Sequence, residues 1–234
     1  MGTLVSYQSG DSVATITMDD GKVNALSPQM LRELGAALDQ AEDDRAVVVL
    51  TGRPGTFSAG FDLRVLRGGG AAASAMVHAG FELAERLLSF PTPVLIAGTG
   101  HTVAMGAFLL LSGDYRIGAA GPYKITVNEV AIGLAVPRVA IEICRQRLAA
   151  AHFTRAVLLA EVYSPDDAVT AGFFDRLVPP AELPDVAAST AAALARLDMD
   201  AHATTKLRAR DQTMKAIRAA IEAGDATLGA SASH

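Results

Sequence analysis

The stretch Ala46–Leu63, AVVVLTGRPGTFSAGFDL, decides the fold of this chain. It opens with a continuous apolar run of strand length, which predicts a strand covered on both faces. A loop rich in glycine and proline follows the run, and a helix is expected after the loop. Because strands alternate with helices on either side of this stretch, the sequence predicts an α/β core with parallel strands.

Other segments predict further elements of the same kind. Ser27-Pro28 is typical of a helix start, with Ser as the cap and Pro in the first turn, and apolar residues recur at helical spacing to about Asp43. The three glycines at 68–70 predict a break before the next helix. Strands are expected over 12–18, 93–98, 114–117, 123–126 and 173–178, and helices over 71–89, 105–112 and 185–223.

Composition excludes several classes of protein. The chain has 234 residues, of which 50% are hydrophobic, and a formal net charge of -5, so it is not disordered. Its length suits one domain, or a domain with a small appendage. The acidic balance and the lack of a basic run argue against nucleic acid as a partner. Cys144 is the single cysteine, and the N-terminus has no signal-peptide pattern, which together predict a cytoplasmic protein.

An uncharged stretch of 27 residues runs from Leu87 to Gly113 and is long enough to span a bilayer. Its prolines and glycines instead predict a buried strand, a tight turn and a buried helix, so no membrane association is expected. Gly98-Thr99-Gly100 has the setting of a dinucleotide fingerprint, but Val103 stands where the third glycine should be. A nicotinamide-dependent dehydrogenase is therefore kept only as an alternative.

Four segments carry the signal for function, and they are Asn24–Ser27 (NALS), Phe57–Leu63 (FSAGFDL), Gly100–Asp114 (GHTVAMGAFLLLSGD) and Asn128-Glu129. Together they resemble the crotonase superfamily, the enoyl-CoA hydratase and isomerase family, over nearly the whole chain. The resemblance implies an α/β spiral of β-β-α units over residues 1–180 that holds an acyl-CoA site. It also implies a helical C-terminal region over 181–234, which builds homotrimers, often paired into hexamers.

Enzymes of this family place negative charge on the thioester oxygen of an acyl-CoA. Two backbone N–H groups that are fixed before the reaction can stabilise that charge. The resemblance assigns the first donor to Phe61, directly after Gly60, and the second to Met105. The family usually has glycine at the second place, so Met105 is a departure, and Gly106 is kept as part of the same turn.

The family's hydratases use two glutamates to hold and activate a water molecule. One of them matches Glu129, but the other falls on Phe108, whose ring cannot activate water. Phe108 is expected to pack in the core, to form a wall of the substrate pocket, or both. A single carboxylate can still move a proton between two carbons, as in the family's Δ3-Δ2 enoyl-CoA isomerases, and burial would raise its pKa toward the range of a general base. The resemblance therefore favours an enoyl-CoA isomerase. An enoyl-CoA hydratase (a lyase) and a non-catalytic acyl-CoA-binding protein are the alternatives.

The resemblance also implies the contacts with coenzyme A, which is part of the substrate, so no separate cofactor is expected. Backbone groups of Asn24, Ala25 and Leu26 are expected to line the CoA channel. The residues expected near the adenine, the pantetheine arm and the phosphates are Ala59, Gly60, Asp62, Leu63, Lys22 and Arg64; the two cations are otherwise ordinary surface residues. The histidines are scattered without metal-ligand spacing, so no metal site is predicted.

Overall fold

The structure, a computed structural model, describes residues 2–224. The strands are β1 (Val5–Gly10), β2 (Val13–Met18), β3 (Val47–Thr51), β4 (Gly55–Ser58), β5 (Val94–Gly98), β6 (Gly100–Val103), β7 (Tyr115–Ala119), β8 (Ile125–Thr126) and β9 (Arg176–Val178). The helices are α1 (Pro28–Asp43), α2 (Leu63–Gly68), α3 (Gly70–Ser89), α4 (Met105–Leu111), α5 (Arg138–Arg145), α6 (Ala150–Val157), α7 (Pro165–Ala171), α8 (Leu183–Leu194), α9 (Met199–Ala209) and α10 (Asp211–Glu222). Short 3-10 turns lie at Val130–Ile132 and Pro180–Glu182.

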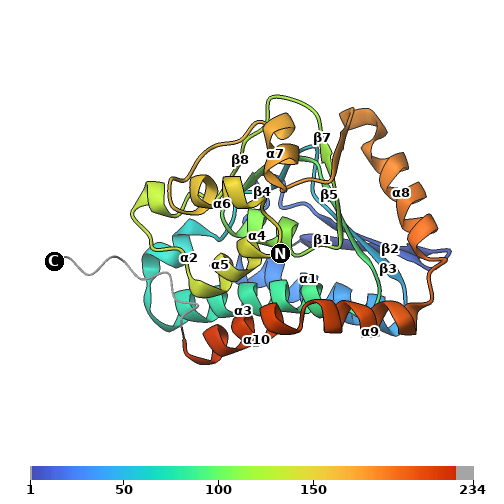
Figure 1. The fold of residues 1–234 in the computed structure, drawn as a ribbon. Helices are drawn as coiled ribbons and strands as arrows, with labels where there is room; N and C mark the ends of the chain where they lie inside the picture. Colours follow the sequence, from blue (N-terminus) through green and yellow to red (C-terminus); the bar gives the residue numbers. More distant parts are fainter. Residues whose placement is uncertain (1, 225–234) are drawn as a thin grey trace.

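The strands form two sheets (Figure 1). The main sheet has the order β1-β2-β3-β5-β7-β9, with β1 antiparallel to β2 and every later pair parallel. The small sheet has the order β4-β6-β8 and is parallel. After α1, the chain repeatedly adds one strand to each sheet and then a helix. This repeat is the spiral of β-β-α units that the sequence predicted.

Both faces of β3 are buried, which confirms the prediction from its apolar run. Successive side chains of a strand point to opposite faces. Val48 and Leu50 therefore enter the larger core with residues of α1, α3 and α4. Val47 and Val49 enter a second core beneath α8. The predicted start of α1 is also confirmed, because the Ser27 hydroxyl accepts the N–H of Met30.

The sequence did not predict β1, β4 or β6. The β4 strand lies inside the expected loop, and β6 begins at Gly100, in the expected turn. Each has four residues, and their pairing shifts register between Thr56 and Ser58. Strands this short depend on their neighbours more than on their own β propensity. Gly100 shows how close the neighbours are, because a Cβ there would lie 2.1 Å from the carbonyl carbon of Gly55.

The C-terminal helices pack on the same body as the rest of the chain. The α8 helix covers one face of the main sheet, and α9 and α10 run along α3 (Figure 1). The predicted boundary at 181 falls in the short turn before α8 and stays a prediction, and residues 225–234 lie outside the described part. The role of the C-terminal region in subunit contacts also stays a prediction. Within residues 2–224, no helix combines the length and the apolar character that crossing a bilayer requires.

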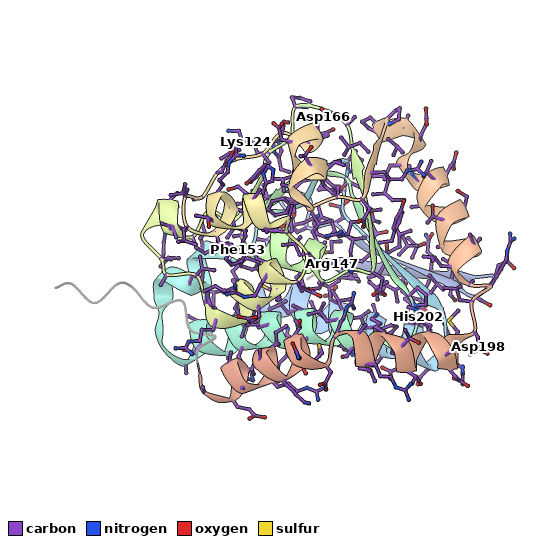
Figure 2. The ribbon with its side chains drawn as sticks, viewed as in Figure 1. Lys124, Arg147, Phe153, Asp166, Asp198 and His202 are labelled. Carbon is purple, nitrogen blue, oxygen red and sulfur yellow. The ribbon has the colours of Figure 1, made fainter. Side chains whose placement is uncertain are left out.

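A buried ion cluster fastens α9 to the start of β7. The Asp114 carboxylate accepts hydrogen bonds from the Nζ of Lys206 at 2.7 Å and the Val94 N–H at 2.8 Å, and it forms an ion pair with Arg210 at 2.9 Å. Figure 2 labels two neighbours of this cluster, His202 on α9 and Arg147. Burial lowers the pKa of Lys206 to about 8, and the Asp114 charge opposes this shift.

Replacing Gly100 by alanine should destabilise the protein, because the new methyl group meets backbone atoms of Gly55 rather than a flexible side chain. We expect a loss of about 3 kcal/mol in the free energy of unfolding, measured by urea denaturation. The matched control is Gly35→Ala in α1, where a Cβ would have nothing within 4 Å. The control should gain about 0.5–1 kcal/mol. Equal stability of the two variants would contradict this account of the β4–β6 contact.

Candidate active site

The small sheet brings three of the predicted functional segments together. Residues 58–61, 103–106 and 126–129 follow or form the carboxyl ends of β4, β6 and β8. Because the three strands are parallel, these ends lie at one edge of the sheet, where α/β proteins commonly bind ligands. Ala104 donates its N–H to the carbonyl of Thr126 at 3.0 Å. Thr126 is therefore a direct neighbour of the residue before α4, and Glu129 follows Thr126 by three residues.

Two glycines allow the first two segments to touch. Gly60 has φ of 87°, and a Cβ there would lie 2.9 Å from the Cβ of Ala104 and 3.3 Å from the backbone nitrogen of Met105. A Cβ on Gly106 would lie 2.6 Å from the carbonyl oxygen of Ser58. A side chain at either position would push the two turns apart. The chain therefore needs glycine at both places for the Phe61 and Met105 backbones to be adjacent.

The direction of the Phe61 N–H is fixed by its own peptide unit. The carbonyl of Gly60 accepts the N–H of Leu26 at 2.8 Å. In a trans peptide the C=O and the following N–H point in opposite directions, so the Phe61 N–H points away from Leu26. Among the described residues, none accepts a hydrogen bond from this N–H. The donor is therefore oriented and unused.

The Met105 N–H has the same two properties. Its peptide carbonyl, on Ala104, accepts N–H groups from Ala107 and Phe108 within α4, so the Met105 N–H points out of the helix N-terminus. Within residues 2–224 this N–H also has no acceptor. Ala104 has φ of 51°, a strained value for a residue that is not glycine. Met105 itself is fully buried, and its side chain extends toward Gly80 of α3.

Sequence reasoning missed Ser58, which holds the first donor turn in place. Its hydroxyl donates to the carbonyl of Asn24 at 2.8 Å and accepts the N–H of Gly60 at 3.2 Å. Both bonds are buried, so the hydroxyl connects the turn after β2 with the turn after β4. The sequence signal was present, because serine commonly bonds to backbone groups two residues away in a turn.

Glu129 is a buried carboxylate with no partner for one of its oxygens. It is 3% exposed, and its Oε2 atom has no hydrogen bond among the described residues. Buried atoms Oδ1 of Asn128 and Oγ1 of Thr126 are also without partners there. Burial raises the pKa of Glu129 to about 7. Burial and then the nearby charge of Glu129 raise the pKa of the Cys144 thiol on α5.

The Phe108 side chain belongs to the core, as the sequence analysis allowed. It is 1% exposed, and its ring centroid lies 6.1 Å from that of Phe81 on α3. The Phe81 ring meets the Phe61 ring edge to face at 6.2 Å. An apolar group of three rings therefore stands where a two-carboxylate site would have its second acid. Whether Phe108 also contacts an acyl chain stays a prediction.

The Asn24–Leu26 backbone is already engaged within the protein. The Asp20 carboxylate, which the sequence analysis missed, accepts the N–H groups of Lys22, Asn24 and Ala25. The Asn24 side chain donates to the carbonyls of Met18, Thr56 and Phe57. Leu26 bonds through its N–H and carbonyl to Gly60 and Asp62. These bonds leave the N–H groups unavailable to a ligand. Asn24 and Leu26 are also 0% exposed, so their predicted CoA contacts do not agree with the structure, and Ala25 is the partly exposed residue of the three.

The remaining predicted CoA residues lie on the surface around the first donor turn. Ala59, Arg64 and Lys22 are exposed, and Leu63 is 50% exposed. Asp62 is buried and caps α2 by accepting the N–H of Arg64. Its hydrogen bond with the Arg64 side chain holds the pKa of Asp62 below its usual value. Arg64 is thus paired, and Lys22 is the freer of the two predicted phosphate-binding cations.

A cavity lined mainly by apolar residues lies away from this edge. It measures about 410 Å³ and lies between the outer face of the main sheet and α8, and its walls include Val49, Ala97 and Leu183. None of the predicted site residues lines it. Within the described residues, no group of three His, Cys, Asp or Glu side chains is placed to hold a metal ion.

The spiral fold and the two adjacent, unused N–H groups define a protein of the crotonase class. The chain matches the enoyl-CoA hydratase/isomerase family over residues 8–234. It therefore belongs to that family, whose members act on acyl-CoA thioesters, and is an enzyme of the enoyl-CoA hydratase/isomerase kind.

Solved structures and curated proteins agree with this assignment. An enoyl-CoA isomerase from Mycobacterium tuberculosis is 47% identical, with a TM-score of 0.92, covering 97% of this chain and 99% of that chain. An enoyl-CoA hydratase from Mycobacterium ulcerans is 46% identical, with a TM-score of 0.93, covering 97% and 100%. Human mitochondrial enoyl-CoA delta isomerase 1 is 31% identical over 219 residues, 90% of this chain and 71% of the human protein. The names of these relatives do not select one reaction.

Removing the Glu129 carboxylate should stabilise the protein at high pH. The folded protein keeps the proton of this group up to its raised pKa of about 7, whereas the unfolded chain releases it near the ordinary pKa of 4.5, so stability falls as the pH rises through this window. Glu129→Gln has no such loss and should be more stable than the wild type by about 3 kcal/mol at pH 8. The difference should shrink toward pH 4.5.

Urea denaturation at several pH values measures this difference. Glu182→Gln, at an exposed position, is the control and should change stability by less than about 0.5 kcal/mol at every pH. A pH-independent difference between Glu129→Gln and the wild type would show that the carboxyl group is solvated in the folded protein.

Proposed function

We propose that this enzyme isomerises a 3-enoyl-CoA to the corresponding 2-enoyl-CoA, with Glu129 as the single acid and base. The observation that carries the proposal is one buried carboxylate with an unpartnered oxygen, together with an apolar ring at Phe108 in place of a second one. The relatives include both isomerases and hydratases, so the choice rests on these two residues rather than on names.

The reaction needs one proton transfer in each direction. Ionised Glu129 takes a proton from C2, and the electron pair left on C2 delocalises onto the thioester oxygen as an enolate. The N–H groups of Phe61 and Met105 form the oxyanion hole for this charge. The protonated Glu129 then delivers its proton to C4 while the double bond moves from C3–C4 to C2–C3. The carboxylate is regenerated, so no other reactant is consumed.

The burial of Glu129 suits this role. A general base works best when its pKa is near the working pH, and burial raises the pKa of this group to about 7. Hydration would need a second polar group to hold a water molecule at C3. Phe108 supplies none, and its ring packs against Phe81.

The CoA moiety would bind over the turns after β2 and β4. The carbonyl of Ala25, the partly exposed residue of the three, would accept from the adenine amino group, and Lys22 would meet a phosphate. These contacts, the homotrimer or hexamer, the cytoplasmic location and the lack of a separate cofactor all stay predictions.

Glu129→Gln should lower the kcat/KM for 3-enoyl-CoA isomerisation by about 10³-fold, because the amide cannot carry the proton. Binding of the CoA ester should stay largely intact, measured by calorimetry. In the wild type, the rate should fall about tenfold per pH unit below pH 7, since only ionised Glu129 can accept the proton from C2. The control is Glu182→Gln. A Glu129→Gln enzyme with wild-type turnover would remove this residue from the mechanism.

Product analysis with two substrates tests the choice of reaction. The wild type should convert a 3-enoyl-CoA to the 2-enoyl-CoA. Given a 2-enoyl-CoA such as crotonyl-CoA, it should form little 3-hydroxyacyl-CoA, because a single carboxylate does not hold and activate water. Chromatography of the two mixtures in parallel provides the measurement. Efficient hydration would select the hydratase alternative, and binding without any turnover would select the acyl-CoA-binding protein.

A further inference from the structure

Gly80 lies in the middle of α3, in a part of the helix that is buried. Glycine is the least favourable helix-interior residue after proline, so an interior glycine usually has a packing reason. A Cβ built on Gly80 would lie 2.5 and 2.6 Å from two ring carbons of Phe61 and 3.6 Å from the Sδ-bound methyl group of Met105. The missing side chain therefore makes room for both residues whose N–H groups form the proposed oxyanion hole.

The Phe61 ring has little freedom to move away from a new methyl group. The ring also meets the ring of Phe81 edge to face, with centroids 6.2 Å apart. Phe81 is fully buried and is itself in contact with Phe108. Phe61 is 7% exposed, so its ring is packed inside the protein. Tightly packed side chains pass such a displacement to their neighbours and to their own backbone.

The Phe61 backbone is the part of this packing that carries chemistry. It lies between the Gly60 carbonyl, which accepts from Leu26, and the Asp62 N–H, which donates to the Leu26 carbonyl at 3.4 Å. These two bonds, together with the bond from the Gly60 N–H to the Ser58 hydroxyl, hold the backbone of this stretch. The contact of the Phe61 ring with Gly80 adds a restraint through the side chain. A push on the ring would therefore tilt the Phe61 peptide about Leu26 and turn its N–H.

We propose that Gly80 is a positioning residue for the oxyanion hole. Its missing side chain leaves room for the Phe61 ring and the Met105 side chain, and the packing of these side chains fixes the direction of both N–H donors. The inference rests on the proposed function of those donors. Gly80 touches no substrate atom and acts only through the two side chains. A donor that is about 1 Å out of place can lower a rate about 10²-fold.

Gly80→Ala should lower the kcat for isomerisation about 10²-fold, while KM for the CoA ester changes less than threefold. Gly35→Ala, on α1 with no atom near the new methyl group, is the matched control and should keep wild-type kinetics. Circular dichroism establishes that each variant is folded. A Gly80→Ala enzyme that is folded and has wild-type kcat would overturn the proposal, because α3 would then have absorbed the methyl group without moving the donors.

A double-mutant cycle separates positioning from general damage. Phe61→Leu removes the two ring carbons that the methyl group would strike but keeps the backbone N–H. It should lower kcat about tenfold, since the Phe61 backbone loses the ring contact with Gly80 that orients its N–H. In the F61L background, adding Gly80→Ala should change kcat less than threefold, in contrast to the 10²-fold effect with Phe61 present. Equal effects in both backgrounds would contradict the proposal. If Gly80→Ala does not fold, unchanged kcat in Phe61→Leu alone would contradict it as well.

A binding measurement keeps this inference separate from the isomerase assignment. The enolate of acetoacetyl-CoA carries negative charge on the thioester oxygen, whereas free CoA has no such oxygen. Gly80→Ala should weaken the binding of acetoacetyl-CoA at least tenfold and leave the binding of free CoA unchanged. If the wild type does not isomerise but this difference appears, the proposed function fails and the positioning role stands. If Gly80→Ala binds acetoacetyl-CoA as tightly as the wild type does, and free CoA as well, the positioning role fails whatever the reaction is.

Discussion

The site depends on the contact between the turn at Gly60 and the N-terminus of α4. A Cβ on Gly60 would lie 3.3 Å from the nitrogen of Met105, so the two main-chain donors can be neighbours only while residue 60 has no side chain. The two turns come from different β-β-α units, and the parallel pairing of β4 with β6 sets their register. The small sheet therefore defines the geometry of the site, although its strands have only two to four residues each.

The buried carboxylate shows the opposing demands of folding and reaction. An isolated carboxyl group in an apolar environment favours its neutral form, and a base must be ionised to act. Glu129 is balanced between the two, with its pKa raised to about 7 by burial. The charge of Asp114, by contrast, is paired with Lys206 and Arg210. Glu129 has no such partner for its Oε2 atom among the described residues, which suits its proposed role as the proton carrier.

Much of the fold could be predicted from the sequence, because its long elements have clear periodicity and caps. Examples are α1 with its Ser27 cap and β3 with its continuous apolar run. The sequence did not reveal β4 and β6, whose four-residue segments contain glycine and pair only because the spiral places them together. The resemblance singled out Phe61, Met105 and Glu129, and the structure places their segments at one edge of the small sheet. The resemblance did not reveal Ser58 or Asp20, although both make turn bonds to backbone groups a few residues away, which are common for serine and aspartate. It did not reveal Gly80 either, since a close contact with a distant turn leaves no local pattern.

Main-chain donors have a consequence for how such an enzyme can change over generations. A substitution at position 61 or 105 alters a side chain but keeps the amide hydrogen, and only proline removes it outright. Methionine at 105 is an instance, because its side chain is directed to α3 and its N–H is still free of acceptors among the described residues. The carboxylate at 129, by contrast, is lost by a single substitution. Drift in this scaffold should therefore erase or replace the proton carrier while the charge-stabilising frame persists, which lets one architecture host a succession of chemistries.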